Sequence, residues 1–162
     1  MKNTIICVDT SSINRAITAT NKGYRLDYRA YYSLAKGDDI LLRALAYGYE
    51  SGPDVKKFMD CLTRYGYQTY FRPTLMSNRE AGKVIYPPNH VRVACDVLQL
   101  VGNADKVIFG IADIQYIDLC KHLLNIGKEV EIFCSNVPGP LRSVCSNYRE
   151  FDVSLLNATE GV

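Results

Sequence analysis

The chain has 162 residues, 48% of them hydrophobic and 22% charged, and a formal net charge of +2. This length suits one domain with a sizeable core, and the composition excludes a disordered chain. No apolar run approaches the ~20 residues that a membrane-spanning helix needs, and the run from Thr4 to Val8 is too short for a signal-peptide core. We therefore expect a cytoplasmic protein without a membrane partner.

Alternating apolar runs and Gly or Pro residues predict strands that alternate with helices. The first strand, Thr4 to Val8, is continuously apolar and β-branched, which is typical of a strand buried on both faces. Further strands are expected at 39–47, 67–71, 106–109 and 129–133, with an edge strand at 151–153. Helices are expected at 24–35, 53–65, 91–101, 113–126 and 138–146, and an irregular loop at 73–88.

This alternation predicts an α/β fold in which right-handed crossovers build a parallel sheet of about five strands, in the order 3-2-1-4-5. The domain is expected to span residues 1–155, followed by a C-terminal tail at 156–162. Ligands of such folds bind beyond the carboxyl ends of the strands. The residues that follow each strand are therefore the candidates for chemistry.

The cysteines lie mostly inside the apolar strand and helix patterns, and none forms a C-x-x-C pair. They are Cys7, Cys61, Cys95, Cys120, Cys134 and Cys145. A disulfide framework belongs to short, loop-rich secreted domains, which this chain does not resemble. We expect six reduced, buried cysteines.

Two stretches are locally basic. Residues 1–36 carry six Lys or Arg against two Asp, and residues 61–95 carry five against Glu80 alone. Such asymmetry marks nucleic-acid footprints, and it also occurs on solvated helix faces. One expected helical stripe holds four tyrosines beside two arginines: Tyr24, Tyr28, Tyr31 and Tyr32 with Arg25 and Arg29. We favour a core face for the tyrosines over a surface that stacks RNA bases.

Three acidic residues fall near the expected carboxyl edge of the sheet. Asp9 follows the first strand, Asp113 follows strand 106–109, and Asp96 lies on the helix before that strand. Clustered carboxylates repel one another unless a divalent cation lies between them, and oxygen ligands suit Mg²⁺ or Mn²⁺. Such an ion can activate water for phosphodiester hydrolysis. Each residue also has a structural interpretation, because Asp9 and Asp113 suit helix N-caps and Asp96 a solvated helix position.

The order of motifs resembles the NYN domains, a branch of the PIN-like nucleases. The resemblance covers roughly residues 4–150. It is carried by the first strand ending in Asp9, by Leu-Arg-Ala-Leu-Ala-Tyr at 42–47, by Arg-Tyr-Gly-Tyr at 64–67, by the stretch 107–116, and by Ile-Gly-Lys-Glu-Val-Glu at 126–131. It implies a three-layer, Rossmann-like (PIN-like) domain.

The resemblance also implies site residues. Asp113 and Gln115 match the two Asp of a Ser-Gly-Asp-x-Asp-Phe signature and Tyr116 its Phe, while His90 and Asp96 match an Asp pair on the preceding helix. It implies an endoribonuclease that hydrolyses RNA, with Asp9, Asp96 and Asp113 as ligands of Mg²⁺ or Mn²⁺. His90 and Gln115 would assist catalysis. The expected RNA contacts are Ser12, which stands where the family has Asn, and Arg15, Arg79 and Lys83.

Two acidic positions of the family have become His90 and Gln115, which weakens a site for a hard cation. The alternative is therefore a catalytically impaired NYN-like domain that acts as an RNA-binding or protein-interaction module. A homo-oligomer is compatible with the sequence, which does not decide the oligomeric state.

Overall fold

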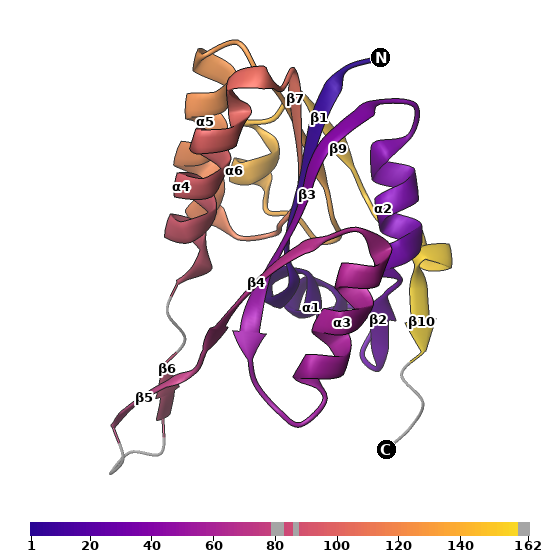
Figure 1. Cartoon of the computed structure of the whole chain (residues 1–162), viewed down its shortest axis with the longest axis vertical. Helices are drawn as coiled ribbons and strands as arrows, with labels where there is room; N and C mark the ends of the chain where they lie inside the picture. Colours follow the sequence, from indigo (N-terminus) through magenta and orange to yellow (C-terminus); the bar gives the residue numbers. More distant parts are fainter. Residues whose placement is uncertain (79–82, 86–87, 159–162) are drawn as a thin grey trace.

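The centre of the molecule is a six-stranded parallel sheet, seen in a computed structural model that describes residues 1–78, 83–85 and 88–158 (Figure 1). Its strand order is β4-β3-β1-β7-β8-β9. The strands are β1 (Asn3–Asp9), β3 (Ile40–Glu50), β4 (Gln68–Pro73), β7 (Lys106–Gly110), β8 (Glu129–Phe133) and β9 (Asn147–Arg149). All five neighbouring pairs are parallel.

Helices cover both faces of this sheet, with α2 and α3 on one side and α4 and α5 on the other (Figure 1). The α-helices are α1 (Thr10–Thr18), α2 (Tyr28–Lys36), α3 (Val55–Tyr65), α4 (Asn89–Leu100), α5 (Ile117–Asn125) and α6 (Gly139–Arg142). The described residues also form the 3₁₀ helices η1 (Val101–Asn103), η2 (Ile114–Tyr116) and η3 (Val153–Leu155). None of the helices in the described part of the chain has the length and apolarity to cross a membrane.

The three-layer α/β class is confirmed, and the five expected strands follow one another in the expected order. The sheet differs from the prediction by one added strand at its edge. This strand is β9 at Asn147–Arg149, whereas the edge strand was expected at 151–153. Because β9 pairs with β8 alone and has three residues, its sequence carries little periodicity.

Two short antiparallel pairs were not expected. Residues 24–26 form β2 (Tyr24–Leu26) instead of the first turn of a helix, and they pair with β10 (Leu156–Ala158). The helix α2 begins only after Asp27, whose side chain accepts a hydrogen bond from the Ala30 amide at 2.9 Å. Residues 156–158, expected in a C-terminal tail, are thus paired to the domain.

The second pair is the hairpin of β5 (Leu75–Asn78) and β6 (Lys83–Ile85), within the segment 73–88 that we expected to be an irregular loop. The hairpin extends away from the body of the domain (Figure 1). The flanking prolines and the polar residues of the segment concealed the short strands, because neither strand is long enough to show alternation.

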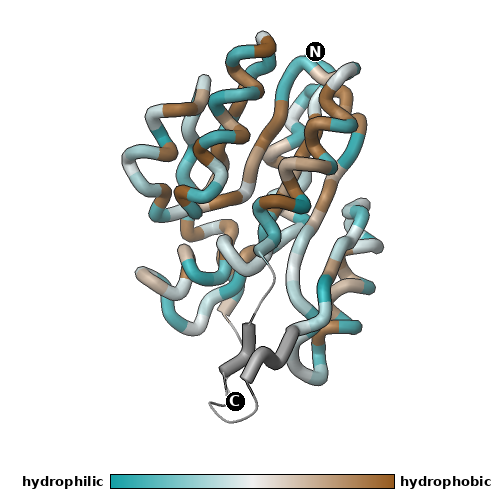
Figure 2. The backbone as a smooth tube through the Cα atoms, turned by 90° about the vertical axis from the view of Figure 1, so that its left-hand side faces the viewer, coloured by the Kyte–Doolittle hydropathy of each residue, from teal (hydrophilic) through white to brown (hydrophobic). Residues whose placement is uncertain are grey.

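The core is built around β1, in which Ile5, Ile6, Cys7 and Val8 are all fully buried. Figure 2 shows brown, hydrophobic stretches along the central strands, while the helices alternate between brown and teal. This is the expected pattern for strands covered on both faces and for amphipathic helices.

Buried tyrosines connect α2 to its surroundings. The Tyr31 hydroxyl donates to the Phe133 carbonyl at 2.9 Å, and the Tyr67 hydroxyl donates to the Tyr28 carbonyl at 2.8 Å. The interpretation of Tyr28 and Tyr31 as core residues is therefore confirmed. Tyr24 lies on β2 and does not belong to that helical face.

All six cysteines are free, but only Cys7, Cys120 and Cys134 are buried. Cys95 is exposed and the other two are half-buried, so the expectation of six buried cysteines is wrong. Cys95 points outward because it lies on the solvent side of the amphipathic helix α4.

At the amino end of the sheet, Asp39 joins three segments. Its carboxylate contacts the Lys106 Nζ at 2.5 Å and accepts hydrogen bonds from the Thr4 hydroxyl at 3.0 Å and the Lys2 amide at 3.1 Å. These partners, the Lys106 hydrogen bond above all, lower the pKa of Asp39 to about 2.

We predict that Asp39→Asn lowers the free energy of unfolding by about 1–2 kcal/mol near neutral pH. This loss is smaller than the free energy that corresponds to the whole pKa shift, because the carboxylate is partly exposed to solvent. Since the folded pKa is depressed, this stabilisation is complete above the unfolded value of about 4 and is lost as pH falls through about 2. Urea unfolding across that range measures it. Asp38→Asn, on the exposed neighbour, is the control, and equal effects of both variants would contradict the prediction.

Candidate active site

Asp9 ends the central strand β1 and begins α1. Its Oδ1 accepts from the Ser12 amide at 3.3 Å, and its Oδ2 accepts from the Tyr116 hydroxyl at 2.6 Å. The residue is only 5% exposed. Burial raises the pKa of Asp9, while the hydrogen bonds from Tyr116 and Ser12 act in the opposite direction. The carboxyl group is therefore held in one orientation at the carboxyl edge of the sheet.

Asp113 reaches the same edge from the neighbouring strand. Because Val8 pairs with Gly110, the segment after β7 emerges beside the end of β1. The Asp113 Oδ1 accepts from the Gln115 amide at 3.0 Å, which caps η2, and its Oδ2 lies 3.5 Å from the Arg15 Nη2. The interpretation of both Asp9 and Asp113 as N-caps is confirmed.

Asp9 and Asp113 line one cavity of about 500 Å³, which we call the acid cavity. Its other lining residues include Arg15, Asn89, His90 and Gln115. The His90 ring meets the Tyr116 ring edge-on, with centroids 6.4 Å apart. Three elements that are distant in sequence, α1, α4 and η2, therefore contribute polar groups to one space.

Asn89 has the least satisfied side chain of this cavity. It is 3% exposed, and neither its carboxamide oxygen nor its nitrogen has a hydrogen-bond partner among the described residues. A buried amide without partners costs about 1–3 kcal/mol, so such groups usually meet a ligand or water. Asn89 thus marks the acid cavity as a binding site for a polar group.

Asp96 does not join the other two acids. Its Oδ2 accepts from the Tyr47 hydroxyl at 2.9 Å and from the Arg92 Nε at 3.0 Å, and it does not line the acid cavity. Asp96 lies six residues beyond His90 on α4, a rise of about 9 Å, which carries it away from the sheet edge. Among the described residues no group of three or more His, Cys, Asp or Glu could hold a metal ion, so the expected three-carboxylate cluster is wrong.

The expected RNA contacts separate into three cases. Arg15 is 66% exposed in its side chain and lines the acid cavity. Ser12 is 1% exposed, and its hydroxyl instead accepts from the Ala112 amide at 2.8 Å, so its expected contact with RNA is wrong. Arg79 lies outside the described residues, as does the side chain of Lys83.

The domain model of the NYN family matches residues 3–153. The chain belongs to the NYN domain family. NYN domains are PIN-like nucleases in general. The fold is also similar to a crystal structure of a protein of unknown function from Vibrio parahaemolyticus, with a TM-score of 0.82 and 17% identity over 96% of this chain and 97% of that one. No curated protein matches the sequence.

Two residues of this NYN domain gained importance only in the structure. Asn89 was visible in the sequence merely as the residue after two prolines at a helix start. Tyr116 was aligned with a Phe of the family signature, and its additional hydroxyl proves to be the donor to Asp9. A hydroxyl added to an aromatic position near an acidic motif is the signal that could have indicated this contact.

The oxygen ligands of the acid cavity fit a Mg²⁺ or Mn²⁺ ion that takes only some of its ligands from the protein. Asp9 and Asp113 offer two carboxylates, and the Asn89 carboxamide offers a neutral oxygen. Mg²⁺ commonly binds enzymes through one or two carboxylates and completes its shell with water and phosphate oxygens. The site suits an ion that arrives with a phosphate, and it does not suit an ion caged by protein groups alone.

We predict that Tyr116→Phe lowers the free energy of unfolding by about 1–3 kcal/mol at neutral pH, because the buried Asp9 carboxylate loses a donor. Urea denaturation measures the loss. The control is the same change in an Asp9→Asn background, where we expect a smaller cost because no buried charge remains to be stabilised. An equal cost in both backgrounds would show that the hydroxyl acts independently of Asp9.

Proposed function

We propose that this NYN domain is a Mg²⁺- or Mn²⁺-dependent ribonuclease that hydrolyses RNA phosphodiester bonds in the acid cavity. The observation that carries the proposal is the meeting of Asp9 and Asp113, from the ends of two adjacent strands, in one cavity of a nuclease-family fold. The unpartnered Asn89 carboxamide supports it, since a phosphate oxygen or an attacking water can satisfy that group.

Asp9 and Asp113 would hold the ion. When bound, such an ion lowers the pKa of a coordinated water and neutralises charge that develops on the phosphate. Asp9 would supply the fixed carboxylate, because its burial and its two hydrogen bonds hold it in place. Asp113 is 30% exposed in its side chain and can adjust to the substrate.

Arg15 would bind the phosphate beside this pair. Its contact with Asp113 is long, at 3.5 Å, and exposed, and such ion pairs contribute about 0–1 kcal/mol. Arg15 can therefore turn from Asp113 to a phosphate oxygen at little cost. His90 can donate a proton to the leaving oxygen as the P–O bond breaks, and the side-chain carboxamide of Gln115 can orient the attacking water.

We predict that Asp113→Asn and Asp9→Asn each reduce RNA cleavage at least ~100-fold, because each removes a carboxylate from a two-carboxylate site. Asp96→Asn should retain most activity, since Asp96 lies outside the acid cavity. The measurement is cleavage of unstructured and looped RNAs in Mn²⁺, with chelator as the blank and circular dichroism as the fold control. Equal losses in all three variants would refute the assignment of Asp9 and Asp113.

We also predict that RNA affinity falls as salt rises, with a slope of about −0.7 per phosphate contacted. Arg15→Gln should make this slope shallower by about 0.7, the contribution of one phosphate contact, because it removes one cation from the cavity rim. Fluorescence anisotropy of a labelled RNA at several salt concentrations measures the slope. Lys57→Gln, on α3 outside the acid cavity, serves as the matched control. An unchanged slope in Arg15→Gln would exclude Arg15 from phosphate binding.

One observation favours a second candidate, a module that binds RNA without cutting it. Asp96 pairs with Arg92 and Tyr47 outside the acid cavity, so fewer carboxylates line the cavity than the family pattern implies. The cleavage assay separates the two functions. RNA that is bound and left intact in Mn²⁺ identifies the module.

We further propose that the protein acts in the cytoplasm. All six cysteines are free, and three of them are at least partly exposed, which suits a reducing compartment.

A further inference from the structure

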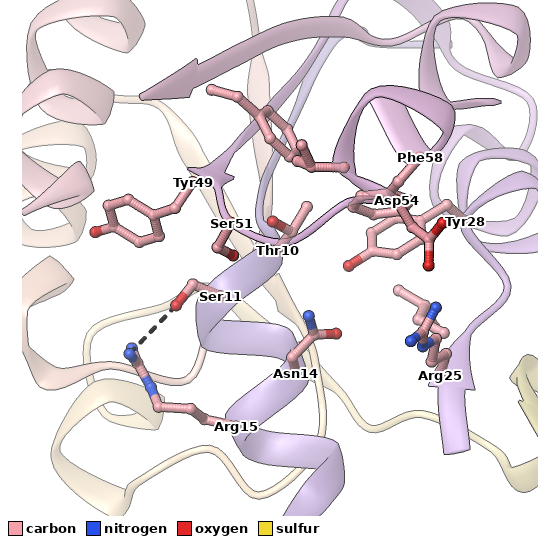
Figure 3. A pocket seen from close by; sticks show the side chains of 13 residues that line it. Thr10, Ser11, Asn14, Arg15, Arg25, Tyr28, Tyr49, Ser51, Asp54 and Phe58 are labelled. Atoms are coloured by element: carbon pink, nitrogen blue, oxygen red, sulfur yellow. Dashed lines mark hydrogen bonds between the residues drawn. The ribbon is translucent and has the colours of Figure 1, made fainter. Parts of the chain in front are cut away.

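A second cavity of about 460 Å³ adjoins the acid cavity, and we call it the aromatic cavity (Figure 3). Ser11, Arg15 and Tyr49 line both spaces. The two cavities therefore share these three residues in their linings. The volume lies within the ~300–1,000 Å³ of small-molecule sites.

Four aromatic residues from different elements line this cavity: Tyr28, Tyr49, Phe58 and Phe71. The Phe58 ring lies edge-on to Tyr28, with centroids 5.5 Å apart, and edge-on to Phe71, with centroids 5.9 Å apart. Gly48 makes room for them, since a Cβ at that position would come within 2.7 Å of the Phe71 ring and the Thr10 hydroxyl. The strand β3 thus keeps an aromatic surface open beside the start of α1.

Tyr28 contributes a buried hydroxyl to the lining of the cavity. Tyr28 is 5% exposed, and its hydroxyl has no hydrogen-bond partner among the described residues. In Figure 3 this hydroxyl points into the space between α1 and α3. Buried tyrosine hydroxyls normally find a partner, so the orphaned group indicates a ligand that carries polar atoms as well as apolar surface.

The side of the cavity away from Arg15 carries one acceptor and one donor. Asp54 precedes α3 and Arg25 lies on β2, and both line the cavity (Figure 3). Neither side chain forms a hydrogen bond or an ion pair within the described part of the chain. Asn14, on α1, adds a carboxamide directed toward the same space. The cavity therefore combines aromatic surface with unused donors and acceptors.

We propose that the aromatic cavity binds one unpaired nucleobase, preferably guanine, of an RNA whose phosphate lies in the acid cavity. A nucleobase offers a flat π-face to aromatic side chains and polar edges to hydrogen-bonding groups. Guanine presents N–H donors at N1 and N2 that suit the Asp54 carboxylate, and acceptors at O6 and N7 that suit the Arg25 guanidinium. Arg15, between the cavities, would contact the phosphate attached to that nucleoside.

This assignment rests on the proposed ribonuclease for its substrate, but its test needs no catalysis. The ¹⁵N-labelled full chain is titrated in chelator with GMP, AMP, CMP and UMP, and amide shifts are followed by NMR. We expect GMP to bind at least about fivefold more tightly than the other three and to shift amides around Tyr28 and Asp54. Weak binding of all four without such shifts would overturn the assignment.

Three variants sharpen the test. Tyr28→Phe should weaken GMP binding about threefold to tenfold, because it removes the unpartnered hydroxyl, and Asp54→Asn should weaken it about tenfold and reduce the preference for GMP. Asp60→Asn, on the same helix but lining neither the acid nor the aromatic cavity, should leave GMP affinity unchanged. Unchanged affinity in both Tyr28→Phe and Asp54→Asn would overturn the assignment.

Cleavage assays keep the two proposals distinct. If RNA is cut and Asp113→Asn stops cutting, while Tyr28→Phe and Asp54→Asn alter neither GMP binding nor the cleavage position, the nucleobase site fails and the ribonuclease stands. If GMP binds with the expected variant effects and no RNA is cut in Mn²⁺, the ribonuclease fails and the nucleobase site stands.

Discussion

The buried Asp9 carboxylate is the constraint around which the carboxyl edge of the sheet is organised. An acid at the end of a fully buried strand is costly unless hydrogen bonds replace water. Here the replacements come from the Ser12 amide at the start of α1 and from the Tyr116 hydroxyl of η2. Both elements must therefore begin close to the end of β1, and their position brings Asp113 to the same edge.

The start of α1 also separates the two cavities. Ser11 and Arg15 line both of them, with carboxylates on one side and aromatic rings on the other. The central strand β1 beneath them is buried, while the polar side chains come from segments that follow the strands. This division is common in doubly wound folds, where the sheet positions the chemistry that the connecting segments supply. In the proposed function, an RNA strand would place a phosphate in the acid cavity and a base in the aromatic cavity, on either side of Ser11 and Arg15.

The errors in the predicted site have physical causes that the motifs did not express. Asp96 matches an acidic position of the family, yet its side chain accepts hydrogen bonds from Tyr47 and Arg92. The rise of α4 along its axis places Asp96 beside β3 and away from the sheet edge. Ser12 stands where the family has Asn, and it joins α1 to the segment after β7. A motif identifies a position along the chain, whereas the direction of a side chain depends on how its helix packs.

The sequence by itself determined the α/β class, the order of the five central strands, and the positions of Asp9 and Asp113 at strand ends. These features follow from local periodicity and from the handedness of crossovers, which need no knowledge of contacts. Only the tertiary structure decided that Asp96 is absent from the cavity, that the Asn89 side chain has no hydrogen-bond partner among the described residues, and that Tyr28 contacts Phe58. Each of these outcomes depends on how elements distant in sequence pack together. The packing of the helices on the sheet sets the positions of their side chains, and no local sequence pattern encodes that packing.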